Sequence, residues 1–426
     1  MDLNTKNVLT NSNFGKRGWS MIIYSFLMYY FWAGLAVDGL NIYTGAFAET
    51  YGMDPNTLLG YATPAGIIGV VGGLIAGKLL IKTGIRNMSS WALIITGVIY
   101  VFFGHFANTH TMFLVFLSLF TFVSMAFGLI ANSALISNWF PRKKGIALGW
   151  ATMGAPACTA TFVAILAILV ATQGVGTACT IIGAVVVVLG IISFFWVKDY
   201  PEQVGAYPDN IKEGADELAT QLKALKEYKS PFTTKVLLRD KDMWLIALGF
   251  GCLWMVTVGV VSQFIPRMMS VGYDQPTALM MLTIAAVIGL AGSYFWGWLD
   301  QKVGTKQATL VYTISYVVAL ALLIIGTPVA TNIAIVFVGL GIGGLLNLMP
   351  SMVITVYGRY DFPAANALVS PIASLMQKGA FIIMALALVS SGGDFTMPYA
   401  IFIGIDIIGA VLLMFVTKQC KGKTGL

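Results

Sequence analysis

Three ionisable residues lie inside long apolar segments of the chain, where a charge is costly. Asp38, Lys378 and Asp406 each have runs of apolar residues on both sides. A charged side chain at the centre of a membrane helix costs about 2.5–3.5 kcal/mol on insertion scales, so residues of this kind usually have a function. A lysine can bind a carboxylate, and an aspartate can carry a proton or pair with a cation. These residues are therefore the first candidates for a binding or proton-coupling site.

Lys378 is the only basic residue near the middle of such a segment. We expect it to attract a negatively charged group of a substrate. The competing hypothesis is an ion pair with Asp406, which lies at a similar depth in the next segment and would make both residues structural. Asp38, in the outer half of its segment, could couple a proton, hold a cationic substrate group, or simply extend to the outer surface.

Aromatic and amide side chains on other apolar segments could surround a small ligand. Aromatic rings supply apolar surface, and amides both donate and accept hydrogen bonds. The alternative role for each of them is ordinary packing. The candidates are Tyr30, Trp32, Asn132, Trp254, Gln263, Tyr294 and Asn347.

The motifs of common enzymes and pumps are absent from the sequence. It contains no Walker A motif, no HExxH and no Gly-x-Ser-x-Gly, which argues against an ATP-driven pump or a membrane protease. The four cysteines form no CxxC pair and no cluster with histidine, so no metal site is expected. We expect a protein that is not an enzyme and has no cofactor.

The composition is that of an all-α integral membrane protein. Of 426 residues, 58% are hydrophobic and 10% are charged, against about 25% charged residues in a soluble domain. A membrane helix needs roughly 20 apolar residues, and the chain contains twelve such runs. The expected spans are 19–44, 58–80, 88–107, 112–138, 145–172, 175–197, 243–266, 277–299, 307–327, 331–356, 364–390 and 396–417.

The distribution of basic residues predicts the orientation of these spans. If both termini are cytoplasmic, all but two of the 25 Lys and Arg residues lie on the cytoplasmic side, the exceptions being Arg267 and Lys378. This is the positive-inside pattern. The net charge of +7 comes from short breaks between apolar runs, so it indicates no nucleic-acid partner. We expect a multi-pass monomer in a bacterial-type inner (plasma) membrane, with the lipid bilayer as its surroundings.

A hydrophilic stretch divides the chain into two similar halves. We expect a six-helix half at 1–197, a cytoplasmic linker at 198–242, and a second six-helix half at 243–426. A shift of 220 residues superposes glycines and basic residues of the first half on those of the second, which predicts two pseudo-symmetric halves. Within the linker, residues 212–229 could lie along the membrane surface as a helix or serve as a flexible tether.

The repeated loop resembles the signature of a known transporter class. Both copies, Gly77-x6-Gly84-x-Arg86 and Gly297-x6-Gly304-x-Lys306, look like the loop after helices 2 and 8 of the major facilitator superfamily. The aspartate that this signature carries is replaced by Ile81 and Gln301. The resemblance implies a major facilitator fold and a gating role for these loops. The gating candidates are Gly77, Lys82, Gly84, Arg86, Gly297, Asp300, Gly304 and Lys306.

A second group of motifs resembles the oxalate/formate antiporter and monocarboxylate porter branches of that superfamily. These motifs are the stretch Asn-Trp-Phe-Pro-Arg-Lys-Lys-Gly at 138–145, the prolines and acids of 201–209, and Met349-Pro350. The resemblance implies a lysine of helix 11 that meets the substrate carboxylate. That lysine would align with Ser374, and Lys378 lies one turn later on the same face, so both are candidates for substrate binding.

Together these features predict a secondary active transporter of small organic anions, such as mono- or dicarboxylates. It would work as an antiporter or a proton symporter by alternating access, with one central site between the two halves. One alternative is a transporter of zwitterionic or quaternary-amine substrates. Another is a transporter-like sensor that does not transport.

Overall fold

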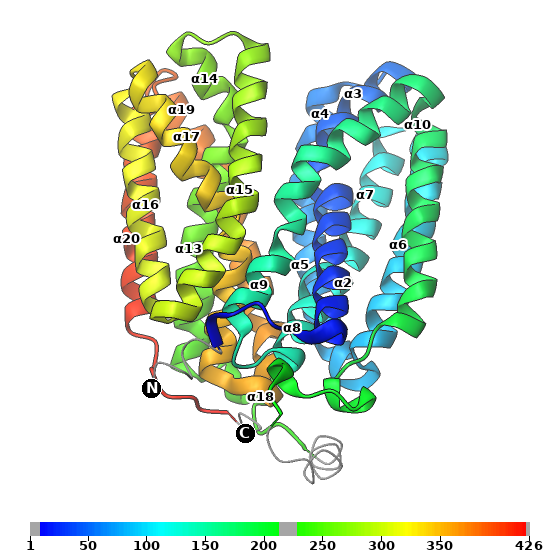
Figure 1. Cartoon of the computed structure of the whole chain (residues 1–426). Helices are drawn as coiled ribbons and strands as arrows, with labels where there is room; N and C mark the ends of the chain where they lie inside the picture. The colour runs from blue at the N-terminus through cyan, green and yellow to red at the C-terminus, as the bar shows by residue number, and fades with distance from the viewer. Residues whose placement is uncertain (1–8, 213–227, 423–426) are drawn as a thin grey trace. The chain divides into compact units, whose positions relative to one another are not determined.

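The computed structural model describes residues 9–212 and 228–422, and every regular element of these residues is helical (Figure 1). All twelve expected spans coincide with helices. The hypothesis of a surface helix within residues 212–229 falls mostly outside the described part of the chain.

Ten helical segments of the described chain are long and apolar enough to cross a membrane, and α17 (Pro328–Ile342) is a shorter apolar helix. Two of the ten join neighbouring expected spans. Lys144–Trp196 contains the fifth and sixth, and Leu345–Ser390 contains the end of the tenth and all of the eleventh, while α17 forms the first part of the tenth. In α10 (Gly154–Trp196) the break falls at Gly174, and in α18 (Leu345–Gln377) it falls at Gly358. Both glycines have positive φ, of 78° and 71°, which glycine adopts without the steric cost of a side chain.

Contacts between residues divide the chain into two compact units. The C-terminal unit combines the described residues of 1–13 and 140–156 with 230–422, and the N-terminal unit combines Phe14–Trp139 with the described residues of 157–229. The expected boundaries at 197 and 242 thus differ from this grouping, because the first part of the fifth span packs with the helices of the second half.

The N-terminal unit is a bundle with two short π-helical segments. Its elements before the fifth span are α2 (Gly15–Ala33), the π-helical η1 (Gly34–Asp38), α3 (Leu40–Tyr51), α4 (Pro55–Gly60), α5 (Ala62–Thr83), α6 (Ile85–Phe106), α7 (His110–Met125), the π-helical η2 (Ala126–Ala131) and α8 (Asn132–Trp139). Most of α10 follows, and then the 3-10 turns η3 (Pro201–Val204) and η4 (Pro208–Asn210).

The C-terminal unit contains the remaining helices. They are α9 (Lys144–Thr152), α12 (Thr234–Leu237), α13 (Lys241–Ser262), α14 (Phe264–Val271), α15 (Gln275–Val303), α16 (Thr305–Ile325), α17, α18, α19 (Gly379–Ser390) and α20 (Thr396–Met414). In this unit α13 packs against both α18 and α20, and α16 packs against α17 and α20. Apolar side chains such as Ile314 and Phe415 remain exposed, as expected of helices that face lipid.

Candidate functional site

The N-terminal unit contains two π-helical turns, in the first and fourth spans. Turns of this kind are rare and are frequent at functional sites. The two turns are neighbours, because a Cβ added to Gly128 of η2 would come within 3.0 Å of the Trp32 ring, just before η1. Trp32 therefore packs directly on the backbone of η2, and the absence of a side chain at Gly128 makes the space for it.

Asp38 is the last residue of η1, and its side chain is held by the fifth span. The Thr159 hydroxyl donates a hydrogen bond to Asp38 Oδ2 over 2.7 Å. About two turns before Asp38 in the first span, the Tyr30 hydroxyl lies 3.0 Å from that of Thr161, and the ring of Phe162 lies 6.0 Å from that of Tyr30. This cluster joins an acid to a set of aromatic rings.

Asn132 and Asn347 each bond the backbone of another span within their own unit. Asn132 Nδ2 donates to the Ser25 carbonyl over 3.0 Å, and Asn347 Nδ2 donates to the Ser293 carbonyl over 2.9 Å. Both side chains are buried, and neither Oδ1 atom has a hydrogen-bond partner in the described chain. Each amide therefore links two spans and keeps one free acceptor.

Lys378 lies at a helix break in the C-terminal unit. It separates α18 from α19, and its backbone N–H donates to the Leu375 carbonyl over 3.1 Å. Among the described residues its ammonium group makes no hydrogen bond and no ion pair. A cation in a membrane span without a protein partner is free to meet a ligand.

The competing hypothesis, an ion pair between Lys378 and Asp406, finds no support among the described residues, where the two side chains form no ion pair. Asp406 is fully buried in α20, and neither carboxylate oxygen has a hydrogen-bond partner in the described chain. Its electrostatic neighbours are Cys252, Tyr312 and Tyr316 rather than a cation. A similar expected depth in the membrane is not enough to bring two side chains together. The rotation of each helix about its axis also sets the direction in which its side chains point.

The remaining ligand candidates of the C-terminal unit are spread over several helices. Trp254 is half-buried in α13, and Gln263 stands at the break between α13 and α14. Tyr294 of α15 packs against Trp150, with ring centroids 5.1 Å apart. Ser374 lies on α18 one turn before the helix break and is half-buried.

The expected gating loop of the second half is part of a close helix crossing. A Cβ added to Gly297 of α15 would come within 3.0 Å of the Gly145 carbonyl oxygen and of the Gly149 Cα, both in α9. Three glycines therefore let the two backbones touch, as small residues do at contacts between membrane helices.

Replacing Gly297 with alanine should force α9 and α15 apart, because the atoms that the new methyl group meets belong to the backbone and cannot rotate away. We expect a cost of about 1–3 kcal/mol, typical of overpacking, visible as a lower melting temperature of the detergent-solubilised protein. Gly404 of α20 has open space around its Cβ position. Gly404→Ala is therefore the matched control, and an equal effect of both variants would contradict the assignment of this crossing.

A network of polar side chains lies at the end of this crossing that we expect to face the cytoplasm. Lys144 donates hydrogen bonds to the Ser351 carbonyl and to the Thr355 hydroxyl. The Ser351 hydroxyl in turn donates to Asp300 Oδ2 over 2.5 Å, and Asp300 also attracts Lys144 electrostatically. Lys144 was not a candidate from the sequence, although it lies within the motif at 138–145.

Gln301 stands where the superfamily signature carries an aspartate, and it bonds the turn before α9. Its Oε1 accepts from the Gly145 N–H over 3.3 Å, and its Nε2 donates to the Arg142 carbonyl over 2.8 Å. A neutral amide can do both, whereas a carboxylate could only accept. Lys306, at the end of the same loop, donates to the Met414 and Val416 carbonyls at the end of α20.

In the first half, the corresponding loop is capped by Asp199, a residue that sequence patterns did not single out. Asp199 accepts hydrogen bonds from the N–H groups of Ile85 (3.2 Å) and Arg86 (2.7 Å), the first residues of α6. Burial raises the pKa of Asp199 despite these bonds. Gly84 has a φ of 77°, and a Cβ there would meet Asp199 Oδ2. Both the backbone conformation and the lack of space therefore favour glycine at this position.

The segment after α20 is fastened to the start of α13. Lys421 forms ion pairs with Asp240 and Asp242. Burial alone would raise the pKa of Asp240, but hydrogen bonds from Lys421, the Asp242 N–H and Tyr357 outweigh it and hold this pKa below its ordinary value. Burial lowers the pKa of Lys421, and its two carboxylate partners raise it more strongly. The ion pairs of Lys421 therefore stabilise the protein at neutral pH. Their contribution is lost in strong acid, where Asp240 binds a proton, and in strong base, where Lys421 releases one.

Comparison with known proteins identifies the family. The family model of the Major Facilitator Superfamily matches residues 82–377 of the 426. The chain therefore belongs to the major facilitator superfamily, a class of membrane transporters rather than enzymes. The family expected from the two loop motifs is confirmed.

Two similar proteins and one solved structure add detail. The chain is 23% identical over 197 residues to the oxalate:formate antiporter of Oxalobacter formigenes, a match covering 46% of this chain and 43% of that protein. It is 26% identical over 349 residues to the inner membrane transport protein RhmT of Escherichia coli K12, covering 78% and 74% of the two chains.

The proton:xylose symporter XylE superposes with a TM-score of 0.74 at 12% identity, over 100% of this chain and 98% of that one. At this identity the likeness concerns the fold alone. It confirms the expected all-α membrane fold with twelve spans.

Proposed function

We propose that this transporter carries small organic anions, such as mono- or dicarboxylates. The observation that carries the proposal is Lys378, whose ammonium group has no partner in the described chain and which stands at a helix break inside a span. An unpaired cation at this position costs free energy unless a ligand compensates it. A carboxylate is a natural partner, because a charge-assisted hydrogen bond to it is strong and short.

Aromatic and amide groups would enclose the rest of the anion. Trp254 and Tyr294 offer half-buried rings in the C-terminal unit, the unit that contains Lys378, while Tyr30 and Trp32 are the half-buried ring candidates of the N-terminal unit. Gln263 stands at a second helix break, where its amide is free to turn toward a ligand. Ser374, one turn from Lys378, could donate a further hydrogen bond.

Asp406 and Asp38 are the candidates for proton coupling. A buried carboxylate without a partner is costly, and binding a proton removes most of that cost. Asp406 meets this description more closely than Asp38, whose carboxylate already accepts a hydrogen bond from Thr159. We therefore assign proton binding first to Asp406, and antiport without protons remains the alternative mode.

The glycine crossing of α9 and α15 would serve as part of a gate. In alternating access, the two sides of the binding site open in turn. Lys144, Asp300 and Gln301 hold the crossing together through side-chain hydrogen bonds. Such bonds can break and reform without disturbing the apolar parts of the helices.

The second candidate is a transporter of zwitterionic or quaternary-amine substrates. It is favoured by the cluster in which Asp38 follows Tyr30 and Trp32 by about two turns and is held by Thr159, close in sequence to Phe162. A quaternary ammonium group binds to aromatic faces, and a nearby carboxylate adds attraction. A sensor that does not transport would bind such ligands without moving them.

Counterflow into proteoliposomes distinguishes these functions. Vesicles loaded with an unlabelled carboxylate should accumulate the same labelled carboxylate from outside, and vesicles loaded with a betaine should not accumulate labelled betaine. Accumulation of betaine alone would favour the second candidate. Binding measured by thermal shift, with no counterflow of either class, would indicate a sensor.

The orientation in the membrane can be tested by labelling introduced cysteines. We propose a bacterial-type plasma membrane with both termini in the cytoplasm. Asn108 and Asp394 are both exposed and follow the third and the eleventh expected span, so cysteines at these positions should react with an impermeant reagent from outside. A cysteine at the exposed Lys235 should react only after permeabilisation. Its labelling in intact cells would contradict the proposed topology.

A further inference from the structure

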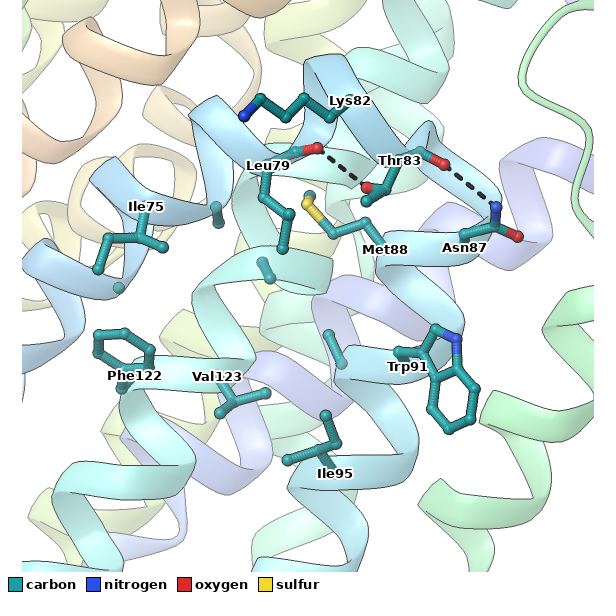
Figure 2. Close-up of a pocket in the computed structure, with 14 residues that line it drawn as sticks. Ile75, Leu79, Lys82, Thr83, Asn87, Met88, Trp91, Ile95, Phe122 and Val123 are labelled. Carbon is teal, nitrogen blue, oxygen red and sulfur yellow. Dashed lines mark hydrogen bonds between the residues drawn. The ribbon is translucent and has the colours of Figure 1, made fainter.

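An apolar groove with exposed walls runs along the N-terminal unit, separate from the candidate substrate-binding and proton-coupling residues (Figure 2). It has a volume of about 610 Å³ and is formed by α5, α6, α7 and the first residue of η2. This volume lies within the range of roughly 300–1,000 Å³ found for small-molecule sites. All of its lining residues belong to one unit.

Small residues form the floor of the groove. Gly72 lets α5 approach the fourth span so closely that a Cβ there would come within 3.0 Å of the Phe122 carbonyl. Ala76, Ala92 and Ala126 continue the floor with single methyl groups. The groove thus exists because the residues at these helix contacts are small. Larger side chains at the same positions would fill it.

The walls of the groove are apolar and exposed. Ile75, Leu79, Trp91 and Ile95 are 51%, 45%, 57% and 44% exposed. In a membrane protein, residues of this kind face hydrocarbon. Figure 2 shows Ile95, Phe122 and Val123 toward one end of the groove.

The other end of the groove is polar. Lys82, Thr83 and Asn87 lie at this end, where α5 ends and α6 begins, and the ammonium group of Lys82 points away from Asn87 (Figure 2). The Thr83 hydroxyl donates to the Leu79 carbonyl, and Asn87 Nδ2 donates to the Thr83 carbonyl over 3.2 Å. The ammonium group of Lys82 is exposed and has no partner in the described chain.

We propose that this groove binds an anionic glycerophospholipid. Its phosphate would lie at the exposed ammonium group of Lys82, and one acyl chain would follow the apolar walls past Trp91. The charge of Lys82 selects an anionic headgroup, and the apolar length of the groove selects a chain over a soluble anion. Trp91 follows Asn87 by one turn of α6, and its ring lies level with Phe122 and Val123 (Figure 2), so a chain leaving the polar end would pass it. This inference does not depend on the substrate proposed above.

Quenching of Trp91 fluorescence by brominated lipids tests the proposal. The full chain is reconstituted in phosphatidylcholine vesicles that contain a minor fraction of brominated phosphatidylglycerol or of brominated phosphatidylcholine. The sequence has ten tryptophans, so the Trp91 signal is the difference between the parent and Trp91→Phe. Brominated phosphatidylglycerol should quench this signal at about fivefold lower mole fraction, the preference expected for one lysine at an anionic surface.

Two charge variants serve as a matched pair. Lys82→Gln should abolish the preference for phosphatidylglycerol. Lys78→Gln removes the same charge from an exposed site one turn earlier in α5, outside the groove lining, and should retain the preference. Equal quenching of the parent by both lipids, or equal losses in the two variants, would overturn the proposal. Quenching that appears only when the protein is diluted in the membrane would overturn it as well, because a second copy would then cover the groove.

Discussion

Replacing Lys378 with alanine should abolish carboxylate counterflow while leaving the protein folded. If the ammonium group meets the substrate carboxylate inside the membrane, its loss leaves a buried anion without a partner. Truncating one member of a buried charge pair costs at least about 2 kcal/mol, which corresponds to about a 30-fold weaker apparent affinity. Measured at a substrate concentration near that of half-maximal counterflow in the parent, transport should fall close to background.

The folded state should tolerate this change, because Lys378 has no partner in the described chain to strand. Removing a charge from a span also lowers the cost of inserting that helix. The melting temperature in detergent should therefore stay equal to or above that of the parent. A large drop would instead show that Lys378 has a structural role.

Two further variants sharpen the test of Lys378. Lys378→Arg keeps the charge and should retain part of the transport, whereas Lys235→Ala, at an exposed position outside the spans, should leave it unchanged. Because Asp406 does not pair with Lys378, adding Asp406→Ala to Lys378→Ala should not restore transport. Restoration in the double variant, or parental affinity in Lys378→Ala, would exclude contact with the substrate.

Asp406→Asn should eliminate uphill uptake driven by an inward proton gradient and preserve exchange of substrate for substrate. Asparagine has nearly the shape of a protonated aspartate but cannot release a proton, so the variant mimics one step of the cycle. Exchange does not require the empty carrier to change its charge. The expected result is that the accumulation ratio falls to about one, while the exchange rate stays near that of the parent.

Asp38→Asn is the matched comparison for proton coupling. Its amide oxygen can still accept the hydrogen bond from Thr159, so we expect both uphill uptake and exchange to continue. Loss of uphill uptake alone in this variant would move the coupling role from Asp406 to Asp38. Weakening of both modes together would favour a cationic substrate group at Asp38. If both variants concentrate substrate like the parent, neither residue carries the proton.

The helical spans and the family follow from the sequence alone. The thickness of the bilayer sets the length of an apolar run, and its low polarity forces every such run to become a helix. Twelve runs therefore predict twelve spans without any tertiary information. The loops around Gly84 and Gly304 resemble the signature of the family, and the positive φ of both glycines explains why glycine occurs at these positions of the motif.

The partners of residues on different helices could be decided only by the tertiary structure. A step of one residue turns a helix by about 100°, so depth in the membrane does not tell which way a side chain points. Lys378 and Asp406 share a depth and do not pair, whereas Asp199 caps α6 from 113 residues away. Gln301, which departs from the family signature, accepts a hydrogen bond from the Gly145 N–H because α9 packs beside α15. Hydropathy determines which segments cross the membrane, and helix rotation and packing determine which of their polar groups meet.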